Sequence, residues 1–225
     1  MSASLAIGFL TTDEINLGAA ARPPAQDRSR QRVALALEAA ERLLIRVGPE
    51  ETSIPEIAKE SGVPRASLYQ YYPNKYVLFA HLAQIHLSRV ERLIAESFLK
   101  TTSRDWEELV RQLIDAVSDY YDATPVAGIL ILGGPFSRTS YLAQEATIGR
   151  IAQAIRLFLR QQELPLLLPQ DPDVATLIVE ISFACMKHGY YRENRISKGI
   201  REQAANAVIA YLRTWQAPGA TLANH

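Results

Sequence analysis

The side chains with the clearest chemical capability lie close together between residues 65 and 75 of this 225-residue chain. Arg65 carries paired N–H donors that match the edge of guanine, and Gln70 carries a donor and an acceptor that match adenine. Tyr69 and Lys75 end in a hydroxyl and an ammonium, and both groups suit phosphate oxygens. Residues 64–72 include no acidic side chain that would repel a phosphate. These residue types therefore predict contact with double-stranded DNA.

A short helix would bring these side chains to one side of the chain. Successive helical residues turn by about 100°, so Tyr72 lies about 40° from Leu68 if Leu68 marks the buried face. Ala66 and Gln70 then lie about 160° to either side of Leu68 and point outward, with Ser67 at the margin of that outward face. The spacing predicts a third helix, to about Tyr72, with one packed side and one small, polar, exposed side.

The preceding residues carry the signals that start and stop two short helices. Ser53 and Glu56 stand three apart, as in a capping box that opens a helix. Gly62 can adopt the left-handed conformation that closes it. Pro64 favours the start of the next helix, and Pro73 prevents its continuation. Two short helices joined by a tight turn that contains glycine are typical of a helix-turn-helix, whose second helix enters the major groove.

Longer helices are expected on both sides of this motif. An apolar stripe predicts a first helix over about 30–47, ended by Gly48 and Pro49. Asn74 is placed to cap a fourth helix over about 75–99. Residues 1–27 are interpreted as an N-terminal arm that belongs to neither unit.

The motif between Ser53 and Lys75 resembles the DNA-binding domain of the TetR (tetracycline-repressor-like) family. The matching stretches are Ser53-Ile54-Pro55-Glu56-Ile57-Ala58, then Gly62-Val63, then Ser67-Leu68-Tyr69-Gln70-Tyr71-Tyr72-Pro73-Asn74-Lys75. The resemblance implies an all-α fold of about nine helices, a homodimer, and a C-terminal domain that binds a small molecule and thereby weakens DNA binding.

The resemblance also assigns roles to individual residues. The positions that it implies for base contacts are Arg65, Ala66 and Gln70, and those that it implies for phosphate contacts are Ser67, Tyr69 and Lys75. Ser53 is included among the expected DNA-binding residues. Two residues depart from the family pattern. Pro64 replaces a frequent Ser or Thr and removes a cap, and Tyr72 replaces a common Phe and places a hydroxyl near the core.

The charge pattern is compatible with a small DNA-binding surface on a neutral body. The chain has 24 basic and 24 acidic residues, whereas residues 28–75 have eight basic and six acidic ones. We expect a DNA-binding domain over 28–75 and a ligand-binding and dimerisation domain over 76–225. The single cysteine, Cys185, cannot form an intrachain disulfide, which suits the cytoplasm. The longest later uncharged run, 123–137, is too short for a membrane span.

The C-terminal half predicts a ligand cavity and a dimer interface. Helical apolar stripes recur there, and cavities often form between bundled helices. The side chains expected to line one are His86, Tyr121, Phe158 and Met186, for a small, mostly apolar or aromatic effector. The last two long helices, about 173–191 and 200–215, are expected to form a four-helix bundle with a second copy. The small residues proposed to permit that close approach are Ala184, Gly189, Ala204 and Ala205, and Val208 is expected at the same interface.

Other functions receive less support from the sequence. His81 and His86 are five residues apart and do not share a helix face, so we expect no metal site and no cofactor. The sequence has no Gly-x-Ser-x-Gly turn, which disfavours a helical hydrolase. A helical interaction protein remains the main alternative, although a face for a protein partner would need more apolar anchors than Ala66. The leading hypothesis is a ligand-responsive transcriptional regulator, a repressor that binds a palindromic operator as a homodimer.

Overall fold

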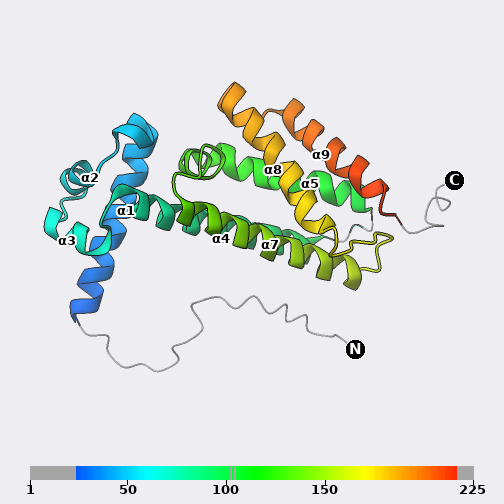
Figure 1. Cartoon of the computed structure of the whole chain (residues 1–225), viewed down its shortest axis with the longest axis horizontal. Coiled ribbons are helices and arrows are strands. Elements are labelled where there is room, and N and C mark those ends of the chain that lie inside the picture. Colours follow the sequence, from blue (N-terminus) through cyan, green and yellow to red (C-terminus); the bar gives the residue numbers. More distant parts are fainter. Residues whose placement is uncertain (1–23, 102, 104, 217–225) are drawn as a thin grey trace.

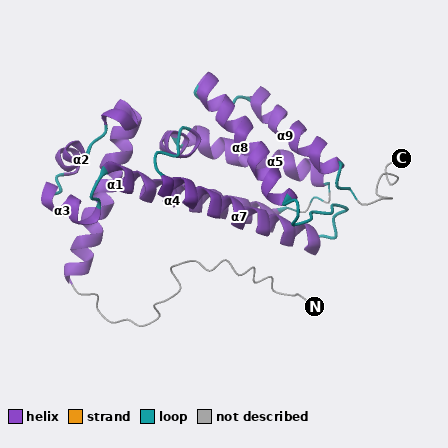
Figure 2. Ribbon diagram, viewed as in Figure 1, coloured by secondary structure: helices purple, strands orange, loops and turns teal. Residues whose placement is uncertain are grey.

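The computed structural model describes residues 24–101, 103 and 105–216, and the chain is an elongated assembly of helices (Figure 1). These residues form nine α-helices and one π-helix and include no β-strand (Figure 2). The elements are α1 (Pro24–Glu51), α2 (Ile54–Ser61), α3 (Arg65–Tyr71), α4 (Lys75–Lys100), α5 (Trp106–Ala123), α6 (Pro125–Ala127), η1 (Gly128–Leu132), α7 (Arg138–Gln161), α8 (Val174–Glu193) and α9 (Lys198–Arg213). The prediction of an all-α fold is confirmed.

Helix α1 is longer than the sequence pattern indicated. It begins at Pro24, so residues 24–27 of the predicted arm form its first turn, while 1–23 lie outside the described residues. At the other end Gly48 has a φ of 82°, which breaks the helical geometry before a last turn that contains Pro49. A left-handed backbone favours glycine because it has no Cβ. The predicted stop at Gly48 is therefore a kink followed by one more turn.

The second and third helices form as their end signals predict. The Ser53 hydroxyl accepts from the Glu56 amide at 3.4 Å and donates to the Glu56 carboxylate at 3.1 Å. Gly62 closes α2 with a φ of 69°, in the left-handed region. Pro64 lies just before α3 as its N-cap and supplies no side-chain cap. Ile57, Val63 and Leu68 fill the core between these helices and α1.

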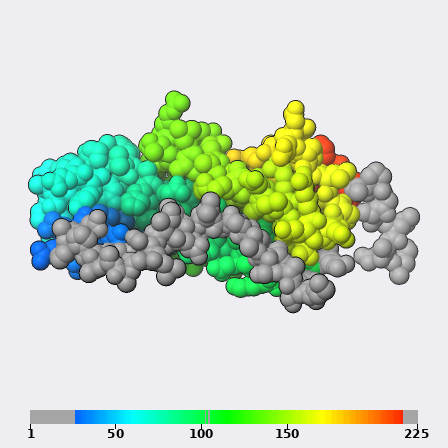
Figure 3. All heavy atoms as spheres, turned by 90° about the horizontal axis from the view of Figure 1, so that it is seen from below, coloured from blue at the N-terminus to red at the C-terminus, as the bar shows by residue number. Residues whose placement is uncertain are grey.

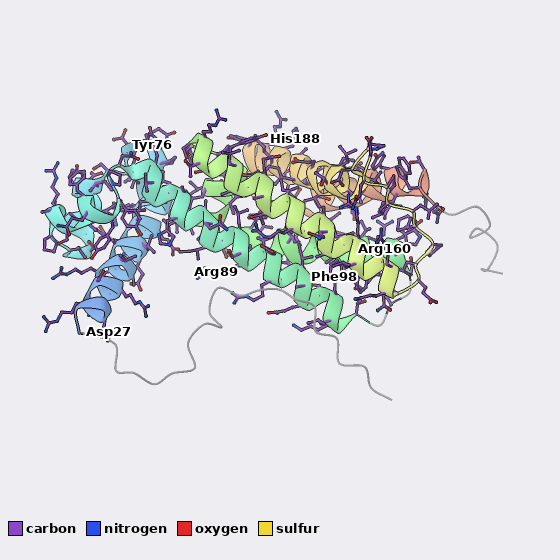
Figure 4. All side chains as sticks on the ribbon, turned by 60° about the horizontal axis from the view of Figure 1, so that its bottom comes forward. Asp27, Tyr76, Arg89, Phe98, Arg160 and His188 are labelled. Carbon is purple, nitrogen blue, oxygen red and sulfur yellow. The ribbon has the colours of Figure 1, made fainter. Side chains whose placement is uncertain are left out.

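Helix α4 joins this N-terminal unit to the rest of the molecule. The Asn74 side chain caps it by accepting from the amides of Tyr76 and Val77. Figure 4 places Tyr76 at the end of α4 beside the N-terminal unit and Phe98 near the other end. Because α4 packs on both α5 and α7, any tilt of this helix would move the N-terminal unit relative to the body.

The body is held by close helix packing and by ion pairs between helices. Helix α9 packs on α8 and α5, and α7 packs on α4 and α8. Arg201 on α9 donates to Asp119 and Asp122 on α5, at 2.5 and 2.8 Å. Arg150 on α7 makes a bidentate contact with Glu91 on α4. Figure 3 shows the yellow loop that follows α7 near the opposite end of the molecule from the cyan α2–α3 unit.

The apolar segment 126–132 is buried except for the partly exposed Ile129, and its helical geometry is unusual. It contains the three-residue α6 and then η1, a π-helix, which is a rare and wider turn. The Tyr190 ring packs where a Cβ would stand on Gly128 and Gly133, 3.2 Å from each of those positions. Helical periodicity alone does not distinguish a π-turn from an α-turn in so short a segment.

The small residues on the last two helices correct one prediction. Gly189, Ala204, Ala205 and Val208 are buried inside a single chain. A Cβ on Gly189 would meet Ile200 at 3.0 Å, so the glycine allows α8 and α9 of the same chain to approach closely. Assigning these four residues to the dimer interface was therefore wrong, and of the predicted set only Ala184 is exposed. A small-residue pattern marks close helix packing without stating which pair of helices packs.

Helices of the described part of the chain are all too short or too polar to cross a membrane.

Candidate DNA-binding surface and effector cavity

Helix α3 presents the face that the helical angles predicted. Leu68 is fully buried and Tyr72 is 4% exposed, so both pack inward. Arg65, Ala66 and Gln70 are exposed, and Ser67 is half-buried at the margin of the same face. The helix has seven residues and no acidic residue in its first turn. The resulting surface of α3 is small, polar and free of carboxylates. Such a surface suits the base edges and the phosphates of a DNA major groove.

The two larger side chains on this face are held by local contacts. The Arg65 guanidinium lies over the Tyr69 ring, 5.7 Å from its centroid. Such a cation–π contact restrains both side chains while leaving the N–H donors of arginine free. Ser53 lies at the N-terminus of α2, where its hydroxyl is engaged with Glu56. The Ser53 hydroxyl therefore has a structural role as a cap whatever it does on DNA.

Lys75 makes a contact that the sequence did not reveal. Its ammonium donates to the carbonyl oxygens of Pro49 at 2.9 Å and Glu50 at 2.7 Å. These bonds tie the start of α4 to the end of α1. An ammonium has three donors, so one N–H of Lys75 stays available for a phosphate. Only the folded chain brings residues 49–50 and 75 together, which explains why the contact was missed.

Positive charge collects at the free end of α1. Arg28, Arg30 and Arg32 are exposed, and none forms an ion pair with the described residues. Arg42 and Arg46, further along α1, both pair with Glu60 on α2, at 3.2 and 2.8 Å. The arginines that remain available to a phosphate backbone are therefore those at the start of α1. Figure 4 shows Asp27 at this same projecting end.

The hydroxyl of Tyr72 is accommodated near the core. It lies 2.8 Å from Nδ1 of His81, and burial raises the pKa of Tyr72 to about 12. Its partner sits on α4, so the hydroxyl links the end of α3 to α4. The Tyr72 hydroxyl, which a phenylalanine at this position would lack, therefore gains a hydrogen-bonding partner and is not left unpaired near the core.

A cavity with a volume of about 130 Å³ lies between α4, α5, α7 and α8. Its wall is almost wholly aliphatic and contains no charged residue. Tyr121 and Met186, two of the four predicted lining residues, lie on this wall. The desolvated hydroxyl of Tyr121 has its pKa raised well above the usual value. Several partly buried residues that line it, such as Val179 and Phe183, come from α8.

The other two predicted lining residues lie elsewhere. Phe158 stacks on Phe98, with ring centroids 4.3 Å apart, so it closes the far end of the body. His86 is fully buried and contacts the Tyr120 hydroxyl through Nδ1 at 2.7 Å and Glu41 through Nε2 at 3.3 Å. It joins α4, α5 and α1 instead of facing the cavity. Phe158 and His86 therefore lie on helices that line the cavity, but their side chains are on other faces of those helices.

Gln144 is a cavity residue that the sequence analysis missed. It is 8% exposed, lines the cavity, and its side chain makes no hydrogen bond with the described residues. The neighbouring hydroxyls are occupied, since Thr147 donates to Ala143 and Ser182 donates to Ile178. A polar Gln144 within the apolar stripe that continues through Ile148 and Ile151 was the available signal. A buried carboxamide without a partner can donate to and accept from a ligand.

The described residues thus combine a helix-turn-helix, whose third helix exposes a polar face, with a helical body that contains an apolar cavity, and α4 joins the two. Residues 36–82 match the family model of "Bacterial regulatory proteins, tetR family". No curated protein sequence matches the chain. Residues 36–82 therefore form a DNA-binding domain of the TetR type, as found in DNA-binding transcriptional regulators.

Solved structures share the fold over most of the chain. A TetR-family transcriptional regulator from Streptomyces coelicolor has a TM-score of 0.57 and 20% identity, covering 82% of this chain and 99% of its own. The fatty acid degradation regulator FadR from Bacillus halodurans has a TM-score of 0.62 and 14% identity, covering 78% and 97%. RolR, solved with resorcinol, has a TM-score of 0.63 and 16% identity, covering 87% and 92%.

Proposed function

We propose that this regulator is a repressor that binds a palindromic operator as a homodimer and releases it when a small molecule enters the inner cavity. One observation carries the proposal. A single helix, α4, begins at Lys75 beside the recognition helix and then supplies Leu87, Val90 and Ile94 to the cavity wall. A ligand that shifts α4 would therefore move the DNA-binding surface. Such a regulator works in the cytoplasm, where the DNA is.

We assign the DNA contacts by the chemistry and exposure of each side chain. Arg65, Ala66 and Gln70 face the bases, where arginine pairs with guanine, glutamine pairs with adenine, and a methyl group meets thymine. Phosphate contacts come from Ser67, Tyr69 and Lys75, with Ser53 at the start of α2. In functional terms 28–75 is the DNA-binding unit and 76–225 is the effector and dimer unit.

The effector that fits best is a neutral molecule about the size of one ring. A dry cavity of about 150 Å³ holds benzene, and the cavity here has about 130 Å³. A charged ligand would lose its hydration without gaining a counter-ion on this wall. Gln144 can bind one or two hydroxyl or carbonyl groups of the ligand. Resorcinol, the ligand of the RolR structure, has this size and polarity and is a reasonable first probe.

The dimer interface that we propose uses the outward faces of α8 and α9. Leu177 on α8 is 40% exposed, Ala184 is exposed, and Ala207 and Ala210 form an exposed pair on α9. These apolar residues lie on the opposite side from the buried Ala204 and Val208. An isologous contact would cover them twice, once from each copy.

The decisive experiment selects DNA from a random duplex pool with the purified chain and then titrates resorcinol and toluene into the complex. We expect a palindromic consensus with half-sites about one helical turn apart, and release of DNA by the neutral ring compound that fits the cavity. Gln144→Leu should keep DNA affinity and weaken resorcinol more than toluene, because toluene has no group for the carboxamide. Failure to enrich any sequence would favour the alternative of a helical protein-interaction module.

A further inference from the structure

A second hollow lies outside the inner cavity, where the N-terminal unit meets the body. This junction cleft has a volume of about 670 Å³ and is formed by the end of α1, the end of α5, the α6–η1 segment and the end of α8. Tyr121 is the only described residue that lines both hollows. The volume is in the range of sites that hold drug-sized molecules. The junction cleft is therefore large enough to be a binding site separate from the inner cavity.

The junction cleft has aromatic walls with fixed positions. The Tyr190 ring packs against Gly128 and Gly133, where any Cβ would stand 3.2 Å from it. Tyr191 donates its hydroxyl to the Gly133 carbonyl at 3.0 Å, and its ring lies 5.5 Å from that of Tyr190 in an edge arrangement. Phe136 completes this aromatic lining. A preformed wall of this kind needs little ordering when a ligand binds.

The electrostatic character of the junction cleft favours a cation. Glu50 brings an exposed carboxylate that forms no ion pair with the described residues. Asp122 contributes a second carboxylate, although Arg201 and the Ile196 amide already bind it at 2.8 Å each. The C-terminal ends of α5 and α8 also reach this lining, and such ends carry partial negative charge. Two positive charges oppose this character: Arg195, whose side chain is 71% exposed and lies 3.9 Å from Glu193, and the Lys75 ammonium, which the backbone carbonyls of Pro49 and Glu50 already bind.

We infer that the junction cleft is a second ligand site, for an amphipathic organic cation such as a protonated amine with a phenyl or short alkyl body. The ammonium group binds near Glu50 and over the tyrosine rings, where a carboxylate and aromatic faces both attract a cation. The apolar body lies against Ile45, Ile129 and Phe136. This ligand differs in charge from the neutral one that fits the inner cavity.

The position of the junction cleft suggests what its ligand would do, a consequence that rests on the proposed function. The carbonyl groups of Pro49 and Glu50 hold the Lys75 ammonium, and Gly48 beside them has the left-handed backbone that kinks α1. A cation beside Glu50 would repel Lys75 and weaken its link to the end of α1. A change in DNA affinity would follow without any ligand in the inner cavity.

The test is calorimetric titration of the full chain, without DNA, with three probes of one shape: 4-phenylbutylamine, 4-phenylbutan-1-ol and 4-phenylbutyrate. We expect the amine to bind at least about tenfold more tightly than the carboxylate, because only the amine gains a charge-assisted contact. Glu50→Gln should remove most of this preference. Ile45→Trp should fill the cleft and weaken the amine at least about tenfold, and its matched control is Leu35→Trp, on the same helix and exposed but outside the lining.

Equal affinities for amine and carboxylate, or equal effects of the two tryptophan variants, would overturn the second site. Toluene, the probe for the inner cavity, should bind Ile45→Trp with the same affinity as it binds the natural chain. Because no arm of this test uses DNA, a failed repressor hypothesis and a failed cleft hypothesis give different results. Thermal unfolding of each variant shows that a lost signal reflects lost binding and not lost folding.

Discussion

At the scale of single residues, the helix-turn-helix contains side chains whose roles differ in kind. Leu68 and Tyr72 hold α3 in place, whereas Gln70 has an exposed carboxamide and no structural task. Lys75 would have both tasks, because the same ammonium that ties α4 to the end of α1 is the one that we propose to contact a phosphate. Substitution of Gln70 should therefore lower DNA affinity alone, whereas substitution of Lys75 should lower both DNA affinity and the stability of the fold.

Gln70→Ala should weaken binding to the selected operator by about 1–3 kcal/mol and relax the preference at one base pair per half-site. The reason is that a bidentate contact with one base disappears while the fold is unaffected. Fluorescence anisotropy on operators mutated one position at a time measures both effects. Gln203→Ala, an exposed glutamine on α9, is the control. An unchanged base preference in Gln70→Ala would refute the assignment of the recognition helix.

His86 predicts a dependence of stability on pH. Burial lowers the pKa of His86, and Arg89 on the same helix adds to the lowering, while Glu41 on α1 acts in the opposite direction. The Tyr120 hydroxyl on α5 faces its other nitrogen. Because the unfolded chain then takes up the proton more readily than the folded chain, the contribution of His86 is present above its unfolded pKa, about 6.5, and is lost as the pH falls toward the lower folded value.

Thermal unfolding between pH 7.5 and 5 should therefore show a falling melting temperature for the natural chain. His86→Gln should flatten this slope, at the cost of a lower melting temperature at pH 7.5. His188→Gln is the control, because His188 is exposed on α8. A slope that survives in His86→Gln would assign the acid sensitivity to other groups, with the carboxylates that form ion pairs as the first candidates.

At the scale of helices, end signals predicted the N-terminal half well because those signals act locally. The cap of Asn74 on α4 and the left-handed Gly62 need only a few neighbouring residues, and both are present. The face that each later helix turns toward a neighbour depends on distant residues. His86 and Phe158 are buried, yet they meet Tyr120 and Phe98 instead of the cavity. Gln144 was overlooked because polarity alone does not place a residue on a cavity wall.

Dependence on distant residues also explains why Val208 was wrongly predicted to lie at the dimer interface. The apolar stripe that includes Val208 exists, but it packs on α5 and α8 of the same chain. Val208→Glu would therefore bury a charge inside each monomer and unfold it, whether or not the chain dimerises. A test of the dimer needs residues that the single chain leaves exposed.

Ala207→Glu should separate the dimer and leave the monomer folded. Ala207 is exposed on α9, and a two-fold contact would bring the two introduced carboxylates close together. Analytical ultracentrifugation should show the monomer mass, with circular dichroism unchanged. Leu142→Glu on α7 is the matched control, since Leu142 is 53% exposed and outside the proposed interface. A dimer that persists in Ala207→Glu at the natural affinity would refute the α8–α9 interface.

At the scale of the whole molecule, the two hollows border two parts of the connection between the N-terminal unit and the body. The inner cavity touches the middle of α4, and the junction cleft touches the end of α1 that holds the first residue of α4. Buried His86 contacts Glu41 and Tyr120 and so joins α4 to α1 and α5. The N-terminal unit is thus attached to the body by α4 and by contacts of α1, and both attachments lie beside a potential ligand.

This arrangement predicts reciprocal coupling between operator and effector. The recognition helices of a dimer must fit major grooves about 34–36 Å apart, so a shift of a few ångströms in α4 would be felt at the DNA. A coupling of about 1–3 kcal/mol would loosen the operator about 5–150-fold on saturation with the inner-cavity ligand, and the operator must loosen that ligand by the same factor. The measurement is a pair of calorimetric titrations of the ring compound that releases DNA, with and without the selected operator.

Glu41→Gln, which removes the carboxylate that α1 brings to His86, should shrink both factors together, because the connection between the two units is weakened at one place. Leu35→Trp on the same helix should leave them unchanged. Equal affinity of the ligand in the presence and absence of operator would refute allosteric release, while a coupling that Glu41→Gln does not change would leave α4 as the only connection that transmits it.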